Sequence, residues 1–247
     1  MKVYLGIDDT DVAGAEIGTG KLVRMYAKKL PEGARMWGVL RHQLLVDDRI
    51  PYTSHNSPAC AVVEVDDPEI VPTLIERAID HLAELASPGS DPGLCVARED
   101  ADFSEVIAFG LSCTREVETQ ERAKAVARAA GIHLSGHGGT NDGIIGATAG
   151  VGLSAYGWSG RFIEFAGKFG PLRDMPDPIP AKDLMARGIL PVTLDRDATV
   201  LPPEQLIYTN GWVSPRLWSG RPVLPAEYKE GRWVALGKKP RDASVAE

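Results

Sequence analysis

The segment KVYLGIDDTD, residues 2–11, places an acidic turn at the end of a short apolar strand. The apolar-rich run from Lys2 to Ile7 predicts the strand. Three carboxylates follow within four residues, Asp8, Asp9 and Asp11. Like charges at such short range disfavour one another unless a cation compensates them, and Mg²⁺ favours one or two carboxylates together with water and phosphates. The turn therefore predicts a metal and phosphate site, with an acidic surface turn whose side chains bond nearby amides as the alternative.

The next elements form a strand, helix, strand order. An amphipathic helix is predicted from Thr19 to Leu30, and a long strand from Arg35 to Val46. One side of the helix carries four basic residues, interpreted as a solvated face with a local basic patch as the alternative: Lys21, Arg24, Lys28 and Lys29.

The middle of the chain predicts an inserted domain. The expected elements are a strand Cys60 to Val65, a helix from Pro68 or Pro72, strands Leu94 to Ala97 and Glu105 to Phe109, a helix Thr114 to Ala130 stopped by Gly131, and a strand Ile132 to Ser135. This β-α-β-β-α-β order is typical of ferredoxin-like domains. A helix from Asn141 to Tyr156 and a strand from Arg161 to Phe165 follow. The predicted class is α/β (α+β).

The residue composition changes after Gly167. Of the 18 prolines, 11 lie between Pro171 and Pro240. Short β-like pieces stand between turns, at Leu206 to Tyr208, Trp212-Val213 and Trp233 to Leu236. They predict a small β-rich C-terminal appendage over residues 167–247, with a segment of little structure as the alternative. Its tryptophans, Trp212, Trp218 and Trp233, favour packing, because large aromatic side chains are rarely left fully exposed.

Composition narrows the class of protein. The formal charge is −7, with 34 acidic and 27 basic residues, which does not suggest a surface that attracts nucleic acid as a whole. The three cysteines form no CxxC pair, so neither a disulfide framework nor a four-thiolate zinc site is expected, and a reducing cytoplasm is. Too few apolar residues precede the acidic turn for a signal peptide, and no run approaches the ~20 residues of a membrane span, so a soluble protein is expected.

Two glycine-rich helix starts resemble one another. In Gly18-Thr19-Gly20-Lys21, unpaired N–H groups and the lysine could receive a phosphate. Ordinary capping is the alternative, and the Walker A pattern is absent because Ala15 and Leu22 stand at its glycine and hydroxyl positions. The segment SGHGGTNDG, residues 135–143, has four glycines, more than a turn requires, which predicts close approach of the backbone to a ligand. The predicted nucleotide-binding residues are Thr10, Gly18, Gly20, Lys21, Gly138, Gly139, Thr140, Asn141 and Asp142.

A polar loop is the fourth candidate element. Arg41-His42 and the run from Ile50 to Ser57 concentrate hydrogen-bonding side chains between two strands, where loops commonly carry function. Either histidine of this region could carry protons or be an ordinary polar residue. A metal site built from His42 and His55 is disfavoured, because no third ligand stands at motif spacing. The predicted substrate-binding residues are Arg41, His42, Tyr52, Thr53, His55, Asn56 and His137.

Together these segments resemble a known family. GIDDTD (6–11), the Thr19 helix start, IPYTSHN (50–56) and NDGIIGA (141–147) are similar, in order and spacing, to the N-terminal half of the archaeal 2-agmatinylcytidine synthetases of isoleucine tRNA and their shorter relatives. The resemblance spans about the first 155 residues. It implies a kinase-like domain, here residues 1–57 and 136–166, that binds ATP and Mg²⁺, with a ferredoxin-like domain, here residues 58–135, inserted in it.

The resemblance also implies a chemistry. The family phosphorylates the 2-oxo group of an anticodon cytosine, and the amine of agmatine then displaces the phosphate. By this resemblance Asp8, Asp9 and Asp11 would hold metal and phosphates, and Thr19 would match a threonine that the family places beside the γ-phosphate. The predicted catalytic residues are accordingly Asp8, Asp9 and Thr19.

The chain also departs from the family. The full-length synthetases continue with an OB-fold and a zinc ribbon that hold tRNA, whereas this chain has no cysteine pairs and about 80 C-terminal residues, too few for both modules. Nucleotide chemistry therefore carries over, and the tRNA substrate does not. The expected function is an ATP- and Mg²⁺-dependent enzyme that activates a substrate oxygen by phosphorylation, with an amine as a possible second substrate. The alternatives are a kinase or ligase acting on a small metabolite and a non-catalytic nucleotide-binding module.

Overall fold

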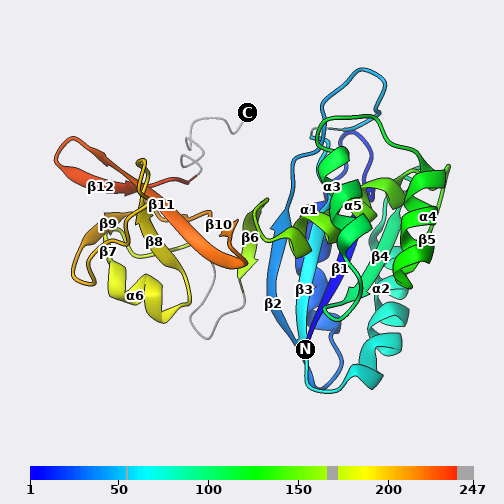
Figure 1. The fold of residues 1–247 in the computed structure, drawn as a ribbon, viewed down its shortest axis with the longest axis horizontal. Coiled ribbons are helices and arrows are strands. Elements are labelled where there is room, and N and C mark those ends of the chain that lie inside the picture. Colours follow the sequence, from blue (N-terminus) through cyan, green and yellow to red (C-terminus); the bar gives the residue numbers. More distant parts are fainter. Residues whose placement is uncertain (54, 166–171, 238–247) are drawn as a thin grey trace.

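The computed structural model describes residues 1–53, 55–165 and 172–237. Within them twelve strands form one sheet, in the order β5-β4-β1-β3-β2-β6-β10-β11-β12-β9-β7, with β8 beside β11 (Figure 1). The strands are β1 (Lys2–Asp8), β2 (Ala34–Arg41), β3 (Ala59–Val65), β4 (Gly93–Arg98), β5 (His133–Gly136), β6 (Arg161–Phe165), β7 (Ile179–Pro180), β8 (Leu190–Thr193), β9 (Leu206–Tyr208), β10 (Arg216–Trp218), β11 (Arg221–Lys229) and β12 (Arg232–Ala235). The helices are α1 (Thr19–Met25), α2 (Val71–Leu85), α3 (Ser104–Ser112), α4 (Gln120–Ala130), α5 (Gly143–Tyr156) and α6 (Ala181–Ala186), with 3-10 turns at Tyr26–Lys29 and Pro68–Ile70.

The main body, residues 1–165, has helices on both faces of an antiparallel sheet. Successive side chains of a strand point to opposite faces. Leu5 and Ile7 of β1 therefore join the core under α1 and α2, whereas Cys60 and Cys95 of the neighbouring strands join the core under α3, α4 and α5. The mixed α+β class predicted from the sequence is confirmed.

Helix α5 lies against β1 and β4 with its backbone in direct contact. The helix is apolar on all sides and nearly all its residues are buried, as a central helix requires. A Cβ atom on Gly6 of β1 would overlap the carbonyl oxygen of Ala147, and one on Gly93 of β4 would overlap the backbone of Gly143. These glycines bring the start of α5 to the end of β1.

The C-terminal module, residues 172–237, extends the same sheet. One residue pair, Arg161 of β6 with Arg216 of β10, joins the two parts of the ladder, and Figure 1 shows the parts meeting there. Phe162 and Phe165 of β6 belong to the apolar core of the module. Trp212 and Trp233 pack against that core, which agrees with the packing predicted for these tryptophans.

One predicted element of the middle region is wrong. Glu105 to Phe109, expected to be a strand, lies inside helix α3. Val106, Phe109 and Gly110 follow the i, i+3, i+4 spacing of a helix and form its buried face. The order over residues 58–135 is consequently β-α-β-α-α-β. In the same sheet, β3 and β4 pair with β1, and β5 pairs with β4. The domain boundaries stay a prediction, and the one at residues 166–167, like Pro171 and Pro240, falls outside the described residues.

Most other elements agree with the sequence. The Thr19 helix start, the β6 strand and the stop at Gly131, which has a left-handed φ of 64°, are confirmed. The predicted strand to Val46 ends at Arg41, the helix expected from Thr114 begins at Gln120, and Trp212-Val213 is no strand. Trp212 instead forms an isolated bridge with Arg173.

Two expectations concern the environment of the protein. No helix among the described residues is both long enough and apolar enough to span a membrane. Cys60, Cys95 and Cys113 are all buried and unpaired, and burial raises the pKa of each thiol to about 12. They are therefore poor nucleophiles at neutral pH.

Candidate functional site

A cavity of about 430 Å³ opens at the carboxyl end of β1, within the size range of small-molecule sites. Its walls come from the turn after β1, the start of α1, the loop at residues 42–58, the start of α5, strand β6 and the segment after α3. The C-terminal module adds Arg173, Trp212 and Ser214. Thirteen of the predicted site residues line it: Asp8, Asp9, Asp11, Gly18, Thr19, Gly20, Lys21, Arg41, Tyr52, Thr53, His55, Asn56 and Asp142.

The acidic side of the cavity is electrostatically strained. Desolvation raises the pKa of Asp8 to about 7, with a smaller contribution from the negative charges of Asp9 and Asp11. Desolvation, then Asp91 and the other aspartates, raises the pKa of Asp9 to about 6. A charged form that is disfavoured in this way gains when a cation binds beside it.

One cavity residue, Asp9, and one residue outside the cavity lining, Asn141, have a left-handed backbone. Asp9 has a φ of 54° and Asn141 a φ of 65°, in the left-handed region that Asp and Asn tolerate better than most residues. Both residues lie at turns, one after β1 and the other before α5. Residues in such conformations cluster at functional sites.

Asp11 holds the start of α1. Its Oδ1 accepts hydrogen bonds from the backbone N–H and the hydroxyl of Thr19, both at 3.0 Å. Its Oδ2 accepts from the hydroxyl of Thr53 at 3.2 Å. Thr10, fully buried, donates its hydroxyl to Thr19 Oγ1 at 3.0 Å. The carboxylate thus links α1 to the loop at 42–58, and the first N–H of α1 is satisfied by protein.

Arginines also line the cavity. The Arg41 guanidinium donates from Nε to the Ser57 hydroxyl at 2.7 Å. Arg24 approaches Glu164 at 3.8 Å, and Arg173 lies with its guanidinium 4.7 Å from the centroid of the Trp212 ring. Lys21 also lines the cavity. Lys21 is exposed, as predicted for a solvated face, but it lines the cavity together with Arg24, so these two residues favour the local basic patch that was the alternative.

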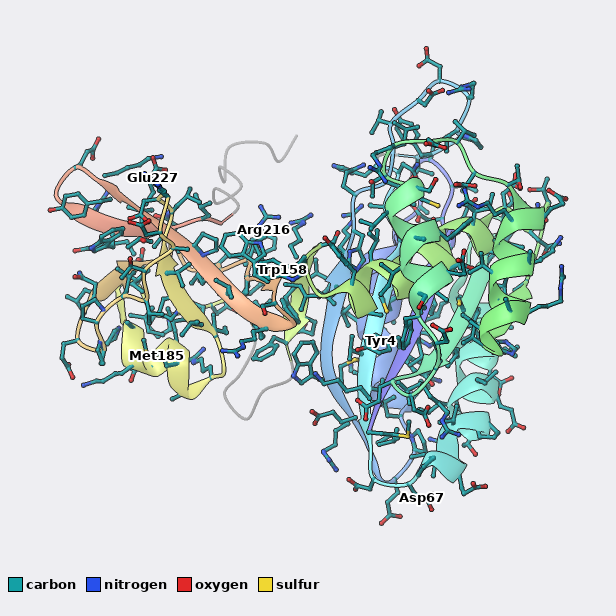
Figure 2. All side chains as sticks on the ribbon, viewed as in Figure 1. Tyr4, Asp67, Trp158, Met185, Arg216 and Glu227 are labelled. Carbon is teal, nitrogen blue, oxygen red and sulfur yellow. The ribbon has the colours of Figure 1, made fainter. Side chains whose placement is uncertain are left out.

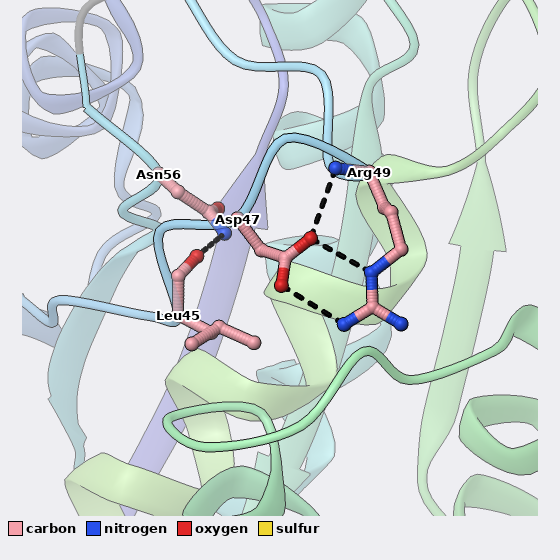
Figure 3. Close-up of polar contacts among 4 residues, drawn as sticks. All are labelled: Leu45, Asp47, Arg49 and Asn56. Atoms are coloured by element: carbon pink, nitrogen blue, oxygen red, sulfur yellow. Dashed lines mark hydrogen bonds and ion pairs between the residues drawn. The ribbon is translucent and has the colours of Figure 1, made fainter.

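Hydrogen bonds close the neck of the loop at 42–58. Figure 3 shows Asn56 donating to the carbonyl oxygen of Leu45, at 2.7 Å. It also shows the Arg49 guanidinium in a two-point contact with Asp47, at 2.8 and 2.9 Å. This contact holds the pKa of the Asp47 carboxyl well below its usual range. Asn56 therefore has a structural role, because it links its segment to Leu45.

The glycine-rich segment 135–143 packs on residues 90–93. A Cβ on Gly139 would overlap Asp91 Oδ1, and one on Gly138 would lie 3.1 Å from the Ser90 carbonyl. The Thr140 N–H donates to Asp91 Oδ1, and the His137 N–H donates to the Pro92 carbonyl at 2.7 Å. Gly138, Gly139, Thr140, Asn141 and His137 lie outside the cavity lining; only Asp142 and Gly143 reach it.

His42 lies behind the cavity wall. It is fully buried, with Nε2 2.8 Å from the Ser154 hydroxyl and Nδ1 3.3 Å from the Ser159 hydroxyl. Desolvation lowers its pKa to about 3, so the ring is neutral at physiological pH. This placement does not favour the predicted role of His42 as a residue that contacts substrate in the main cavity.

The donor set fits magnesium only in part. Among the described residues no three Asp, Glu, His or Cys side chains are grouped so that they could hold a metal ion. Asp8 and Asp9 both face the cavity, and Mg²⁺ commonly takes one or two carboxylates and completes its shell with water and phosphate oxygens. The two aspartates therefore suit a magnesium ion that arrives with a phosphate ligand.

Sequence reasoning missed several lining residues. Gly146 is one: a Cβ there would overlap Asp8 Oδ2, so only glycine leaves room for the Asp8 carboxylate. Its place in the NDGIIGA segment was the available signal. Arg161, Arg173, Trp212 and Ser214 carried no local motif, because their position depends on how distant strands pair.

Comparison with known proteins agrees with the fold. No protein-family model and no curated protein matches the chain. Solved structures do match. Over 62% of its length the chain is TiaS-like. A tRNA fluorescent labelling enzyme shares 28% identity at a TM-score of 0.53. Apo TiaS, a tRNA agmatidine synthetase, shares 26% at 0.51, and TiaS in complex with its tRNA and ATP shares 27% at 0.53.

The match is partial on both sides. The chain spans 36%, 35% and 36% of these three structures, about a third of their length. The TiaS-like resemblance inferred from residues 6–11, 19, 50–56 and 141–147 is confirmed at the level of structure.

Proposed function

We propose that this chain is an ATP- and Mg²⁺-dependent enzyme that activates an oxygen of its acceptor by phosphorylation. One observation carries the proposal: two desolvated aspartates and several arginines line a single cavity. That arrangement suits a metal-bound polyphosphate, whose cation meets the acids and whose oxygens meet the guanidinium groups. The similarity to TiaS, solved with ATP, supports the same class of ligand.

The roles of the residues follow from their placement. Asp8 and Asp9 would hold Mg²⁺, which when bound neutralises charge on the transferring phosphoryl group. Arg41 and Arg24 would bind phosphate oxygens, and Lys21 would add a point charge at the start of α1. The acceptor oxygen would form a bond to the terminal phosphorus as the bond to the bridging oxygen breaks, so that ADP leaves.

Thr19 and Asp11 would hold the elements that line the cavity in place and would not take part in the reaction. The Thr19 hydroxyl is engaged with Asp11 and Thr10. Asp11 in turn holds Thr53 of the loop at 42–58. An amine could then form a bond to the carbon that carries the phosphorylated oxygen, as the bond between that carbon and oxygen breaks and inorganic phosphate leaves. The proton of the amine would pass to solvent or to a carboxylate of the site.

Turnover of ATP tests the proposal. Asp8→Asn and Asp9→Asn should each lower turnover by about 100-fold or more, because each removes charge that neutralises the phosphoryl group. Asparagine keeps the shape, and it tolerates the left-handed φ of Asp9. Release of ADP is measured by chromatography with Mg²⁺ and either bulk tRNA or a panel of amines and carboxylic acids. Asp48→Asn, an exposed carboxylate outside the cavity, is the control. Unchanged turnover in both variants would end the proposal.

A small-metabolite acceptor is the second candidate. The C-terminal module contributes Arg173 and Trp212 to the cavity lining, which leaves less room there for a macromolecule. Stimulation of ATP cleavage by a small amine or acid, and not by tRNA, would favour it. ATP that binds by calorimetry but emerges uncleaved in every mixture would instead identify a nucleotide-binding module.

A further inference from the structure

A second hollow adjoins the main cavity. Its volume is about 190 Å³. It shares Arg41, His55, Ser57 and Arg161 with the main cavity, so these residues separate two adjoining spaces. Its other lining residues are His42, Gln43, Ser159, Gly160 and Arg216. The hollow therefore stands where β2, β6 and the C-terminal module meet.

Three arginines face this hollow from three strands. Arg41 ends β2, Arg161 begins β6 and Arg216 begins β10, and the last two are paired residues of the ladder. Among the described residues none of the three lies within 4.0 Å of a carboxylate. By contrast, several other arginines have such a partner, for example Arg35 with Asp66 and Arg98 with Asp100.

The arginines of the hollow repel one another. Desolvation lowers the pKa of Arg161, and the charges of Arg41 and Arg216 lower it further. Desolvation lowers the pKa of Arg41 as well, and the charges of Asp11 and Asp8 offset this in part. Neither aspartate is among the groups that shift the pKa of Arg161. A cluster of cations in a recess, without a carboxylate at ion-pair distance in the described part of the chain, is relieved when an anion binds between them.

The back of the hollow is fixed in shape. Gly160 has a φ of 90°, and a Cβ there would lie 2.6 Å from the ring of His42. The same ring meets the Ser159 hydroxyl at 3.3 Å. Because His42 is neutral, it adds no charge and serves to hold the segment that leads into Arg161. Because the recess is already formed, little conformational entropy is lost in ordering it when a ligand binds.

We propose that this hollow binds a phosphate group of the acceptor substrate. The inference rests on the proposed function and extends it: the acceptor is a phosphate ester, held by Arg216, Arg161 and Arg41, with its reactive oxygen toward the main cavity. The phosphate comes either from an RNA backbone or from a small sugar phosphate. Figure 2 shows Arg216 and Trp158 where the main body meets the C-terminal module. Trp158 is 58% exposed, so an RNA base could stack on it.

Binding of inorganic phosphate tests the site without turnover. Protein with ¹⁵N-labelled arginine is first saturated with AMPCPP and Mg²⁺, so that the main cavity is filled, and phosphate is then titrated. The Nε–H signals of Arg41, Arg161 and Arg216 should shift together. Arg216→Gln should weaken phosphate binding about tenfold, as expected for loss of one charge-assisted contact. Arg221→Gln, an exposed arginine of the same module outside both cavities, should leave it unchanged.

Two results would overturn the inference: no shift of the three signals, or equal phosphate affinity in Arg216→Gln and the native chain. AMPCPP binding is measured in parallel by calorimetry. If AMPCPP binds the native chain and Arg216→Gln equally while phosphate affinity is also equal, the further inference fails and the proposed function stands. If AMPCPP fails to bind the native chain, the proposed function fails, and phosphate is titrated alone.

The source of the phosphate is decided with two further probes. For a labelled single-stranded RNA, Arg216→Gln should lower affinity about tenfold and reduce the salt slope of log Kd by about one. Trp158→Ala should also weaken RNA binding. For ribose 5-phosphate, Arg216→Gln should weaken binding, whereas Trp158→Ala should not. Loss of affinity with either probe supports the site, and loss with neither contradicts it.

Discussion

The acidic turn at residues 8–11 and the glycine-rich segment at 135–143 differ in their surroundings: the aspartates border a cavity, whereas the glycines pack against protein atoms. Both stand out in the sequence as places where a phosphate could sit. The carboxylates of Asp8 and Asp9 face the cavity, and no cation of the described residues lies beside them at ion-pair distance. The glycines at 136–139 instead approach protein atoms, chiefly the backbone and side chains of residues 90–92 and Asn141. A local concentration of one residue type therefore indicates that the site restricts which residues fit. Only the atoms around it show whether the restriction comes from a ligand or from packing within the protein.

Gly139→Ala should cause the largest loss of stability among the substitutions that test this comparison. Its left-handed φ of 52° and the overlap of a Cβ with Asp91 should lower the free energy of unfolding by about 3 kcal/mol. Gly131→Ala, with a φ of 64° and open space around it, should cost only about 1 kcal/mol. Urea unfolding measures both, and calorimetry measures ATP affinity of the folded protein. A tenfold loss of ATP affinity with unchanged stability would place Gly139 at a ligand instead.

Thr19→Val tests the acidic turn, the other region of the comparison. It removes the hydroxyl that links Asp11 and Thr10, and leaves buried partners unsatisfied. The expected loss of stability is about 2 kcal/mol, and Thr19→Ser should restore most of it. Thermal unfolding checks the change, with ATP turnover read on the same samples. Full stability in the valine variant, together with lost turnover, would show that the hydroxyl acts on the ligand and not on the fold.

The smallest effect is expected from pH at His42. Its folded pKa of about 3 lies below its ordinary value of 6.5, so the unfolded chain binds a proton that the folded chain does not. Stability from this group is complete above about pH 6.5 and falls by about 1 kcal/mol per pH unit below it. His42→Gln should flatten the dependence between about pH 6.5 and 5 relative to the native chain. Parallel curves for the two proteins in urea titrations would contradict the assignment.

Local patterns were sufficient for most of the main body. A period of 3.6 or 2, together with a stop such as Gly131, predicted α1, α2, β1, β3 and β6 within a few residues. Glu105 to Phe109 failed because a run of five residues with apolar positions fits either period, and only packing against α5 decides for the helix. The acidic turn could be recognised because its three charges are neighbours in the chain.

The remaining site residues depend on pairing between distant strands. Arg161 and Arg216 are 55 positions apart, and they become neighbours only through the ladder of β6 and β10. Arg173 and Trp212 reach the cavity for a similar reason, because residues 172–237 fold back against β6. Charge that is assembled in this way leaves no motif in the sequence.

The contact of α5 with β1 and β4 affects how mutational scans of this protein should be interpreted. Alanine at position 6, 93, 143 or 146 forces a methyl group into backbone or into the Asp8 carboxylate. Growth or expression screens would score these positions as intolerant regardless of any chemistry nearby. Arg216 is half exposed and forms no ion pair among the described residues, so its replacement should not disturb close packing in the same way. In such a screen, intolerance at Arg216 would therefore be the more informative signal of ligand binding.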